Sequence, residues 1–320
     1  MSQTSPSTTS QIKLSQQPVH WLYSFWKFSR PHTIIGTSLS VFALYVIALA
    51  TVSEGLTWLD LRQLLGTWIA CLLGNVYIVG LNQLEDVEID KINKPHLPIA
   101  AGEFSRRQAG LIVVISGILA LLLAELLGPW LFLMVSTSLA IGTAYSLPPV
   151  RLKRFPVWAA LCIFGVRGAV VNLGLFLHFS WVLQGKVAIT PTPAAWILTV
   201  FVLIFTFAIA IFKDVPDLEG DKQYNITTFT IRLGKEAVFN LARWVVTVCY
   251  LGMMLAGLFF ASSVNLYFLG ITHLAALIIL WWRSQNVDLQ DKIAIASFYQ
   301  FIWKLFFLEY LIFPAACLLA

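Results

Sequence analysis

Long apolar runs, separated by short polar segments, make up most of the chain beyond its first twenty residues. Crossing the hydrocarbon core of a bilayer takes about 20 mostly apolar residues. The runs do not alternate apolar and polar positions as strands of a membrane barrel would, and helices pair their backbone groups internally. The pattern therefore predicts nine membrane helices, at residues 34–52, 62–84, 107–127, 130–146, 156–179, 194–213, 237–260, 264–282 and 295–318.

Composition supports an all-α membrane protein. The chain of 320 residues is 58% hydrophobic and only 12% charged, whereas soluble domains are about 25% charged. Residues 1–20 are rich in Ser, Thr and Gln and lack the apolar stretch of a secretory signal, so they are expected to form a disordered polar tail. Residues 21–320 are expected to form a single polytopic domain.

Basic residues are distributed unevenly between the two predicted sides of the membrane. The formal net charge is +5, and one set of loops holds almost all Lys and Arg while the other holds only Arg62 and Lys186. The positive-inside rule then predicts a cytoplasmic N-terminus and an external C-terminus. Because these basic residues flank membrane helices, no nucleic-acid partner is expected.

A short acidic motif occurs twice. Residues 86–91 read DVEIDK and follow the second predicted helix, and residues 217–222 read DLEGDK and follow the sixth. The copies are four helices apart, which predicts two related four-helix halves plus a ninth helix. An even number of spans places both copies on the same, cytoplasmic face.

The first motif forms a polar stripe. Asn82, Asp86, Asp90 and Lys94 recur every fourth residue, and at 3.6 residues per turn such positions share one face of a helix. Like charges at this spacing destabilise a helix, and the negative end of the helix dipole adds to the cost. Both effects favour a bound cation, and hard oxygen ligands suit magnesium (Mg²⁺).

The second motif repeats the arrangement. Lys213, Asp217 and Asp221 form the equivalent stripe, and Asp214 lies one turn before Asp217. Pro216 and the glycine at position 220 loosen the backbone where the helix is expected to end.

Cations lie close to both acidic motifs in the sequence. Lys94, Arg151, Lys153, Arg154 and Lys213 suit an anion. Carboxylates that bind metal beside cations that bind phosphate imply a diphosphate held between them. The alternative is that these charges are solvated loop residues that set topology, but that alternative leaves the repetition of the pattern unexplained.

The segments NQLEDVEIDKINKP and KDVPDLEGD closely resemble the two signatures of the UbiA-type intramembrane prenyltransferases. The resemblance extends from FWKFSRPHTIIGTSLS (25–40) to FYQFIWKLFFLEYL (298–311). It implies about nine helices around a central cavity, and two Asp-rich motifs that bind an isoprenoid diphosphate through Mg²⁺. Gln83 departs from the broad family pattern, in which many members carry a second acid at that position.

Further segments resemble the homogentisate-prenylating branch of the family in cyanobacteria, among them GNVYIVGLNQL, INKPHLPIAAG and GTAYSLPPVRLKRF. This resemblance implies transfer of a phytyl group from phytyl diphosphate to homogentisate, with decarboxylation, on the route to tocopherol. It also implies a cyanobacterial plasma or thylakoid membrane. Open alternatives are 4-hydroxybenzoate or a chlorophyllide as acceptor, solanesyl or geranylgeranyl diphosphate as donor, and, outside enzymes, a Mg²⁺ transporter.

The same resemblance implies roles for the acidic residues. Asn82, Asp86 and Asp90 would hold one metal ion, and Asp86 and Asp90 are expected to be catalytic. Asp217 and Asp221 would hold and use a second metal ion, with Asp214 as a further ligand.

The remaining candidates are expected to bind substrate. Lys94 and Lys213 are the first candidates for the diphosphate, followed by Arg151, Arg154 and Arg30, and Tyr145 or Tyr77 is a candidate to face the allylic cation. Arg167 lies deep in the fifth apolar run, where a charge is usually paired or functional. It is a candidate for the homogentisate carboxylate, although an interhelical salt bridge is the commoner role.

Overall fold

The computed structural model describes residues 18–52, 57–185, 187, 190–213, 215–216, 218, 228–260 and 263–320. Within these ranges every regular element is a helix, so the predicted all-α class is confirmed. The elements are α1 (Pro18–Phe28), α2 (Pro31–Leu49), α3 (Trp58–Glu85), α4 (Val87–Asn93), α5 (Arg106–Leu127), α6 (Pro129–Ser146), η1 (Leu152–Arg154), α7 (Pro156–Phe164), η2 (Gly165–Val170), α8 (Val171–Leu183), α9 (Pro193–Phe212), α11 (Phe229–Leu233), α12 (Lys235–Phe259), α13 (Leu266–Ser284) and α14 (Lys292–Leu318).

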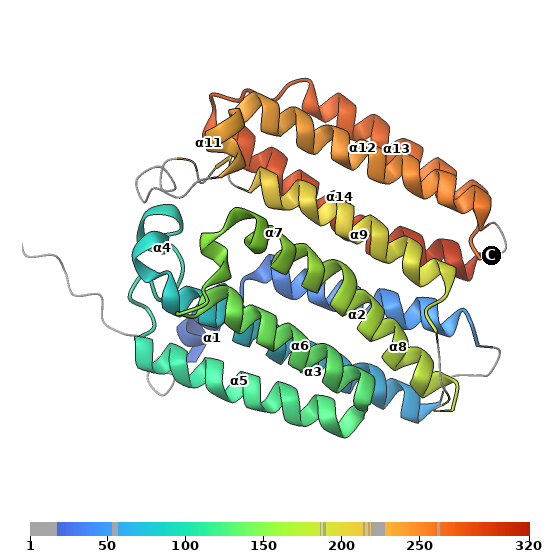
Figure 1. Ribbon diagram of the computed structural model, residues 1–320, viewed down its shortest axis with the longest axis horizontal. Coiled ribbons are helices and arrows are strands. Elements are labelled where there is room, and N and C mark those ends of the chain that lie inside the picture. The colour runs from blue at the N-terminus through green and yellow to red at the C-terminus, as the bar shows by residue number, and fades with distance from the viewer. Residues whose placement is uncertain are drawn as a thin grey trace, which may run out of the picture.

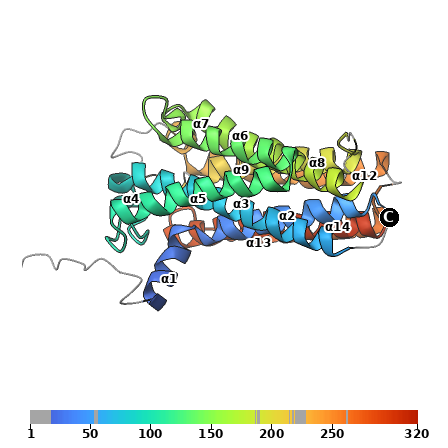
Figure 2. The ribbon, with the colours of Figure 1, turned by 90° about the horizontal axis from the view of Figure 1, so that it is seen from below.

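Most of the predicted tail, residues 1–17, lies outside the described residues. Its last three residues, 18–20, belong to α1. Helix α1 packs its Phe28 ring edge-on against Phe104, and Figure 2 shows it leaving the bundle at a steep angle.

Eight described helical segments are long and apolar enough to cross a membrane, and α7, η2 and α8 together form one of them, Val157–Leu183. The ninth predicted span corresponds to α6, which is not among those eight but packs between α3, α5 and α8. Its hydroxyl groups lower its hydropathy, and two of them bond to carbonyls inside the helix. Ser138 donates to the Met134 carbonyl at 2.8 Å and Thr143 to that of Leu139 at 2.7 Å.

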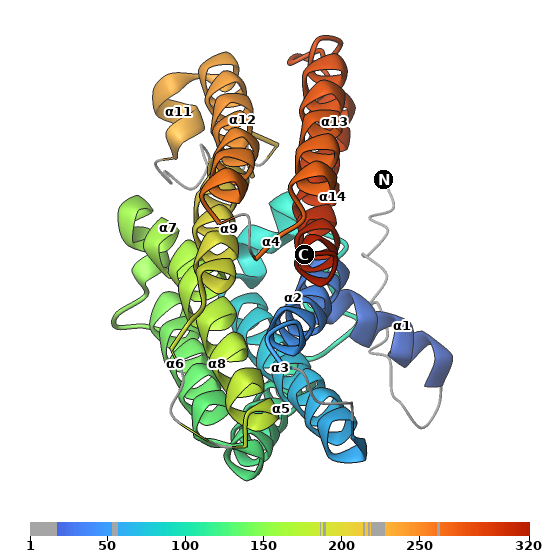
Figure 3. The same ribbon diagram turned by 90° about the vertical axis from the view of Figure 1, so that its right-hand side faces the viewer.

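The two predicted halves show the same order of helix packing. Helix α3 packs along α5 and α5 against α6, just as α9 packs along α12 and α12 against α13. The ninth helix, α14, packs against α2 and α9 and so joins the two halves, as Figure 3 shows end on. The C-terminal ends of α3 and α9, from which the two acidic motifs continue, point to the same end of the bundle (Figure 1).

Hydropathy does not distinguish helices that face protein from those that face lipid. Helices α9 and α5 have nearly equal mean hydropathy, 2.7 and 2.6, yet 67% of the α9 span is buried and only 28% of the α5 span. Helix α5 buries a narrow stripe that includes Ser116, Gly117 and Ala120, which allows close approach to α3. A Cβ atom at Gly117 would lie 2.6 Å from the Tyr77 ring, so this contact depends on glycine.

Candidate active site

The predicted stripe of the first motif survives a break in the helix. Helix α3 ends at Glu85 and α4 begins at Val87, with Asp86 at the junction. The backbone N–H of Asp86 donates to the Asn82 carbonyl at 3.0 Å, that of Asp90 to Asp86 at 2.8 Å, and that of Lys94 to Asp90 at 2.8 Å. These successive four-residue bonds keep the polar positions on one face.

Two cations share one oxygen of Asp86. The Lys153 ammonium lies 2.6 Å from Oδ1 of Asp86, and Nη2 of Arg151 lies 3.2 Å from the same atom. The other oxygen, Oδ2, accepts a hydrogen bond of 2.8 Å from the amide of Asn82. Burial lowers the pKa of Lys153, and the Asp86 carboxylate opposes that change. Two positively charged side chains therefore lie against the first motif.

Arg30 reaches the same site from the connection between α1 and α2. Its Nη2 atom donates to Oδ1 of Asn82 at 3.0 Å. Two amides of α3 hold the preceding backbone, since Gln83 donates to the Phe28 carbonyl at 2.7 Å and Asn75 donates to that of Ser29 at 3.3 Å. Gln83 thus supports the position of Arg30 rather than facing the acidic stripe.

Arg30 and Arg151 are the non-glycine residues of the described chain with positive φ, at 53° and 39°. Such left-handed conformations cost about 1–3 kcal/mol and persist where the surroundings enforce them, often at functional sites. Both arginines contact the first motif, so the strained backbone coincides with the candidate active site.

Asp90 is the most buried acidic residue of the first motif. Its side chain is 5% exposed, and its Oδ2 atom is buried without a hydrogen-bond partner among the described residues. Burial raises the pKa of the Asp90 carboxyl, and Arg30 and Lys94 act against this rise. A carboxylate oxygen is the hard type of ligand that Mg²⁺ prefers, and the described residues alone hold no group of three or more acidic, histidine or cysteine side chains that could bind a metal ion.

The second motif begins at the same end of the bundle. Lys213 follows the last residue of α9 and its backbone N–H donates to the Ile209 carbonyl at 3.0 Å, whereas the predicted ligands Asp214, Asp217 and Asp221 lie outside the described residues. Lys94 and Lys213 are both half-buried.

A row of rings runs from the end of α9, through α14, to His32 at the start of α2. The Phe212 ring stacks on Tyr299 at 5.9 Å between centroids, Tyr299 contacts Trp303 at 6.3 Å, and Trp303 meets His32 at 5.2 Å. Phe212 directly precedes Lys213, and His32 lies two residues after Arg30. The row therefore runs from the residue before the second motif to a residue close in sequence to Arg30, which contacts the first motif.

The remaining candidate residues differ in their burial and their contacts. Arg154 is exposed, while its neighbour Lys153 forms an ion pair with Asp86. Tyr145 is half-buried near the end of α6. Tyr77 is held by a 2.8 Å hydrogen bond to Thr143, which favours a packing role. Spacing in the sequence does not indicate which of the adjacent residues Lys153 and Arg154 faces Asp86.

Arg167 lies within the span Val157–Leu183, in the π-helical segment η2. The expected interhelical salt bridge does not form with any residue that the structure describes. Instead, the guanidinium group lies over the ring of Trp303, 4.9 Å from its centroid. Trp303 therefore contacts Arg167 and His32, and no sequence pattern indicated its central position.

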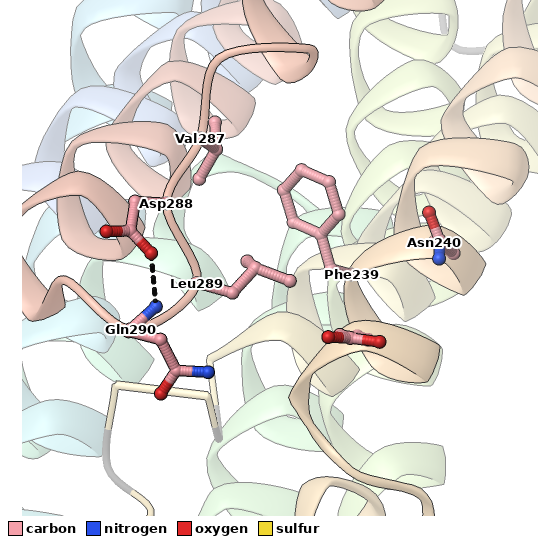
Figure 4. Close-up of a pocket in the computed structure, with 7 residues that line it drawn as sticks. Phe239, Asn240, Val287, Asp288, Leu289 and Gln290 are labelled. Atoms are coloured by element: carbon pink, nitrogen blue, oxygen red, sulfur yellow. Dashed lines mark hydrogen bonds between the residues drawn. The ribbon is translucent and has the colours of Figure 1, made fainter.

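A separate surface pocket lies between α12 and the connection from α13 to α14 (Figure 4). Glu236 and Asp288 give it an acidic lining, together with apolar side chains such as Phe239 and Leu289. Asp288 accepts a 2.8 Å hydrogen bond from the backbone of Gln290. An acidic lining does not suit a diphosphate, so this pocket is not the candidate active site.

Comparison with known proteins identifies the class of this membrane protein. Residues 39–305 match the model of the UbiA prenyltransferase family. The homogentisate phytyltransferase of Synechocystis sp. is 56% identical over 92% of this chain and 96% of its own length. Homogentisate phytyltransferase 1 of Arabidopsis thaliana is 41% identical over 92% of this chain and 75% of its own length.

The fold agrees with a solved structure from the same family. The UbiA homolog from Archaeoglobus fulgidus bound to GPP and Mg²⁺ matches with a TM-score of 0.61 and 17% identity, over 93% of this chain and 100% of that one. The helical bundle is thus that of an intramembrane prenyltransferase. The chain belongs to the UbiA prenyltransferase family, as its two acidic motifs predict.

Proposed function

We propose that this protein transfers a phytyl group from phytyl diphosphate to homogentisate, releasing diphosphate and carbon dioxide and giving a methyl-phytyl-benzoquinol of the tocopherol pathway. The observation that carries the proposal is the 56% identity, over nearly the full length of both chains, to a homogentisate phytyltransferase. The cation-lined acidic motif supplies the chemistry that such a reaction needs.

The protein residues divide into ligands and anion-binding groups. Asn82, Asp86 and Asp90 would hold one Mg²⁺, and Asp217 and Asp221, with Asp214, would hold another. Mg²⁺ would offset the negative charge that develops on the departing diphosphate. The relative from Archaeoglobus fulgidus, solved with GPP and Mg²⁺, supports this assignment.

The cations of the site are positioned to bind the diphosphate. Arg30, Arg151 and Lys153 already lie against the first motif, and Lys94 and Lys213 complete the candidate set. Groups aimed at a leaving group whose charge increases stabilise the transition state more than the ground state.

The bond changes balance without an added reagent. The allylic carbon–oxygen bond breaks, and its electron pair leaves with the diphosphate. An electron-rich ring carbon of homogentisate forms the new carbon–carbon bond and loses its proton. The carboxylate leaves as carbon dioxide, and the electron pair that remains on the side-chain carbon takes up one proton to give the methyl group.

Rings beneath the diphosphate site would keep the allylic cation away from water. Trp303 and Phe306 are buried, and Tyr299 links Trp303 to Phe212. A dry, aromatic environment protects a carbocation from capture by water and stabilises its charge. Tyr145, half-buried at the end of α6, is a further candidate for such a contact.

We also place the active site and the N-terminus on the cytoplasmic side of a cyanobacterial plasma or thylakoid membrane. The uneven distribution of Lys and Arg supports this orientation.

The proposed function can be tested with purified protein in lipid nanodiscs. The assay combines Mg²⁺, homogentisate or 4-hydroxybenzoate, and phytyl or geranylgeranyl diphosphate, with mass spectrometry of the products. We expect the methyl-phytyl-benzoquinol as the main product. Prenylation of 4-hydroxybenzoate with homogentisate left untouched would overturn the acceptor assignment. Mg²⁺ flux into sealed vesicles without any prenylated product would instead support the transporter alternative.

A further inference from the structure

Arg167 is a cation surrounded by aromatic rings inside the membrane-spanning bundle. Its guanidinium carbon lies 4.9 Å from the centroid of the Trp303 ring and 5.7 Å from that of Phe306. On another side lies Gly36, where a Cβ atom would be 3.9 Å from Nη1 of Arg167 and 3.2 Å from the Phe307 ring. The residue as a whole is half-buried.

This cation has no anionic partner in the described part of the chain. No hydrogen bond or ion pair joins its guanidinium group to a described residue, although the hydroxyl-bearing rings of Tyr299 and Tyr310 interact with it electrostatically. A charge at this depth is costly, and proteins normally pair it or use it to bind a ligand. Stacking on Trp303 offsets only part of the cost.

The backbone around Arg167 is irregular. Arg167 lies in a π-helical turn, a feature that often marks functional sites. The amide of Asn172 donates to the carbonyls of Arg167 at 3.1 Å and Gly168 at 2.8 Å. Tyr310 of α14 donates to Oδ1 of Asn172 at 3.1 Å. The fully buried Asn172 therefore supports the irregular turn that carries Arg167.

Trp303 separates Arg167 from the cations of the candidate diphosphate site. Its ring contacts His32 at 5.2 Å and lies under the Arg167 guanidinium. His32 in turn interacts electrostatically with Arg30, Lys94 and Arg167. A molecule beside Trp303 could thus reach both the reacting end of the donor and Arg167.

We infer that Arg167 binds the carboxylate of the aromatic acceptor. This inference rests on the proposed function, which gives the acceptor one aromatic ring and one carboxylate. The donor chain is apolar and cannot neutralise Arg167, and the diphosphate has its own cations near the first acidic motif. Trp303 and Phe306 lie against the guanidinium group of Arg167, and a guanidinium group binds a carboxylate through two parallel hydrogen bonds.

Decarboxylation removes the charge that this site recognises. While homogentisate is bound, its carboxylate offsets the charge of Arg167. Once carbon dioxide has left, the quinol product is neutral and no longer forms the ion pair. The same residue therefore selects the substrate and favours release of the product.

The test compares two ligands that differ by the carboxylate. Homogentisate and methylhydroquinone share a dihydroxylated ring, and only homogentisate is an acid. Their equilibrium binding to the full chain in nanodiscs, without donor, isolates recognition from turnover. Wild-type protein should prefer homogentisate by about 10- to 100-fold, the contribution of hydrogen bonds to a charged group. Arg167→Gln should lose this preference while binding methylhydroquinone as wild type does.

A matched control is Arg243→Gln. Arg243 is also half-buried and lies over a tryptophan, 4.6 Å from the ring centroid of Trp281, but on α12. This variant should keep the preference for the acid. If Arg167→Gln keeps it as well, or if wild type shows none, the inference is wrong.

Steady-state kinetics gives a second readout. Arg167→Gln should raise KM for homogentisate and leave KM for the prenyl diphosphate within about twofold, whereas damage to the fold would affect both. Tyr310→Phe, which weakens the support of Asn172, should raise KM for homogentisate by less. If Arg167→Gln does not fold, Arg167→Lys serves instead, and it should retain part of the preference.

The role of Arg167 can be tested even if the proposed acceptor is wrong. If wild type prenylates 4-hydroxybenzoate instead, the binding comparison is repeated with 4-hydroxybenzoate and phenol. The proposed acceptor would then be wrong, while Arg167 would still be tested as the carboxylate anchor.

Discussion

Nε2 of His273 lies 3.3 Å from Oε2 of Glu309, and this pair joins α13 to α14 inside the second half of the bundle. Both side chains are almost completely buried, at 0% and 1% exposure. Nδ1 of His273 lies 2.9 Å from the Leu269 carbonyl, so Nδ1 carries a hydrogen. The contact between Nε2 of His273 and the carboxyl group of Glu309 is then attractive only if one further proton is bound, either to Nε2 or to the carboxyl group.

This pair should stabilise the fold without taking part in turnover. We expect His273→Leu and Glu309→Leu each to cost about 3–5 kcal/mol of unfolding free energy, because each leaves a buried polar partner alone. The double variant should recover most of that loss. The measurement is reversible unfolding in lipid or detergent.

Recovery in the double variant distinguishes a pair from two independent packing sites. Losses that simply add would contradict the paired model. Lys304→Leu is a control on the same helix, because Lys304 is exposed and should contribute little.

Lys153 and Arg154 are adjacent cations with different surroundings. Lys153 lies 2.6 Å from Asp86, whereas Arg154 is exposed. Lys153→Gln should lower kcat/KM for the prenyl diphosphate by about tenfold or more, since a charged hydrogen bond contributes about 1.5–3 kcal/mol. Arg154→Gln should have a smaller effect, within about threefold. Equal losses in the two variants would show that general positive charge, rather than position, matters here.

The sequence predicted the features that depend on local spacing. The polar stripe of the first motif follows from four-residue spacing, and four-helix periodicity predicted that α3 and α9 end on the same side. Lys153 could not be chosen over Arg154, because their directions depend on the short turn η1 after the left-handed Arg151.

Long-range pairs could not be predicted. Glu309 of α14 contacts His273 on the neighbouring helix α13. Similarly, Asn172 supports the backbone around Arg167 and accepts a hydrogen bond from Tyr310 of α14. These roles depend on which helix faces are adjacent, and periodicity within one helix does not specify that.

Topology offers a prediction that is independent of chemistry. Counting α6 with the eight more apolar spans gives an odd number, so the chain ends should lie on opposite sides of the membrane. Reporter fusions at residues 1 and 320 should report a cytoplasmic N-terminus and an external C-terminus. Both ends on one side would mean that α6 does not cross, or that another span is missing.

The last prediction concerns the two acidic motifs as a single site. Asp86 contacts Lys153 and Arg151, and α9, which precedes Asp217 in the sequence, ends at the same end of the bundle as α3. If both motifs hold metal on one diphosphate, Asp86→Asn and Asp217→Asn should each reduce kcat by about 100-fold or more, because each weakens stabilisation of the leaving group.

The double variant tests whether the motifs act together. Groups that act as a unit are strongly non-additive, so Asp86→Asn/Asp217→Asn should be little slower than either single variant. Expression and thermal stability serve as controls, and both should be maintained because removing a like charge relieves repulsion within each motif. Near-normal turnover in a folded single variant would exclude that motif from the site. Two losses that multiply would instead mean that the motifs contribute independently to the transition state.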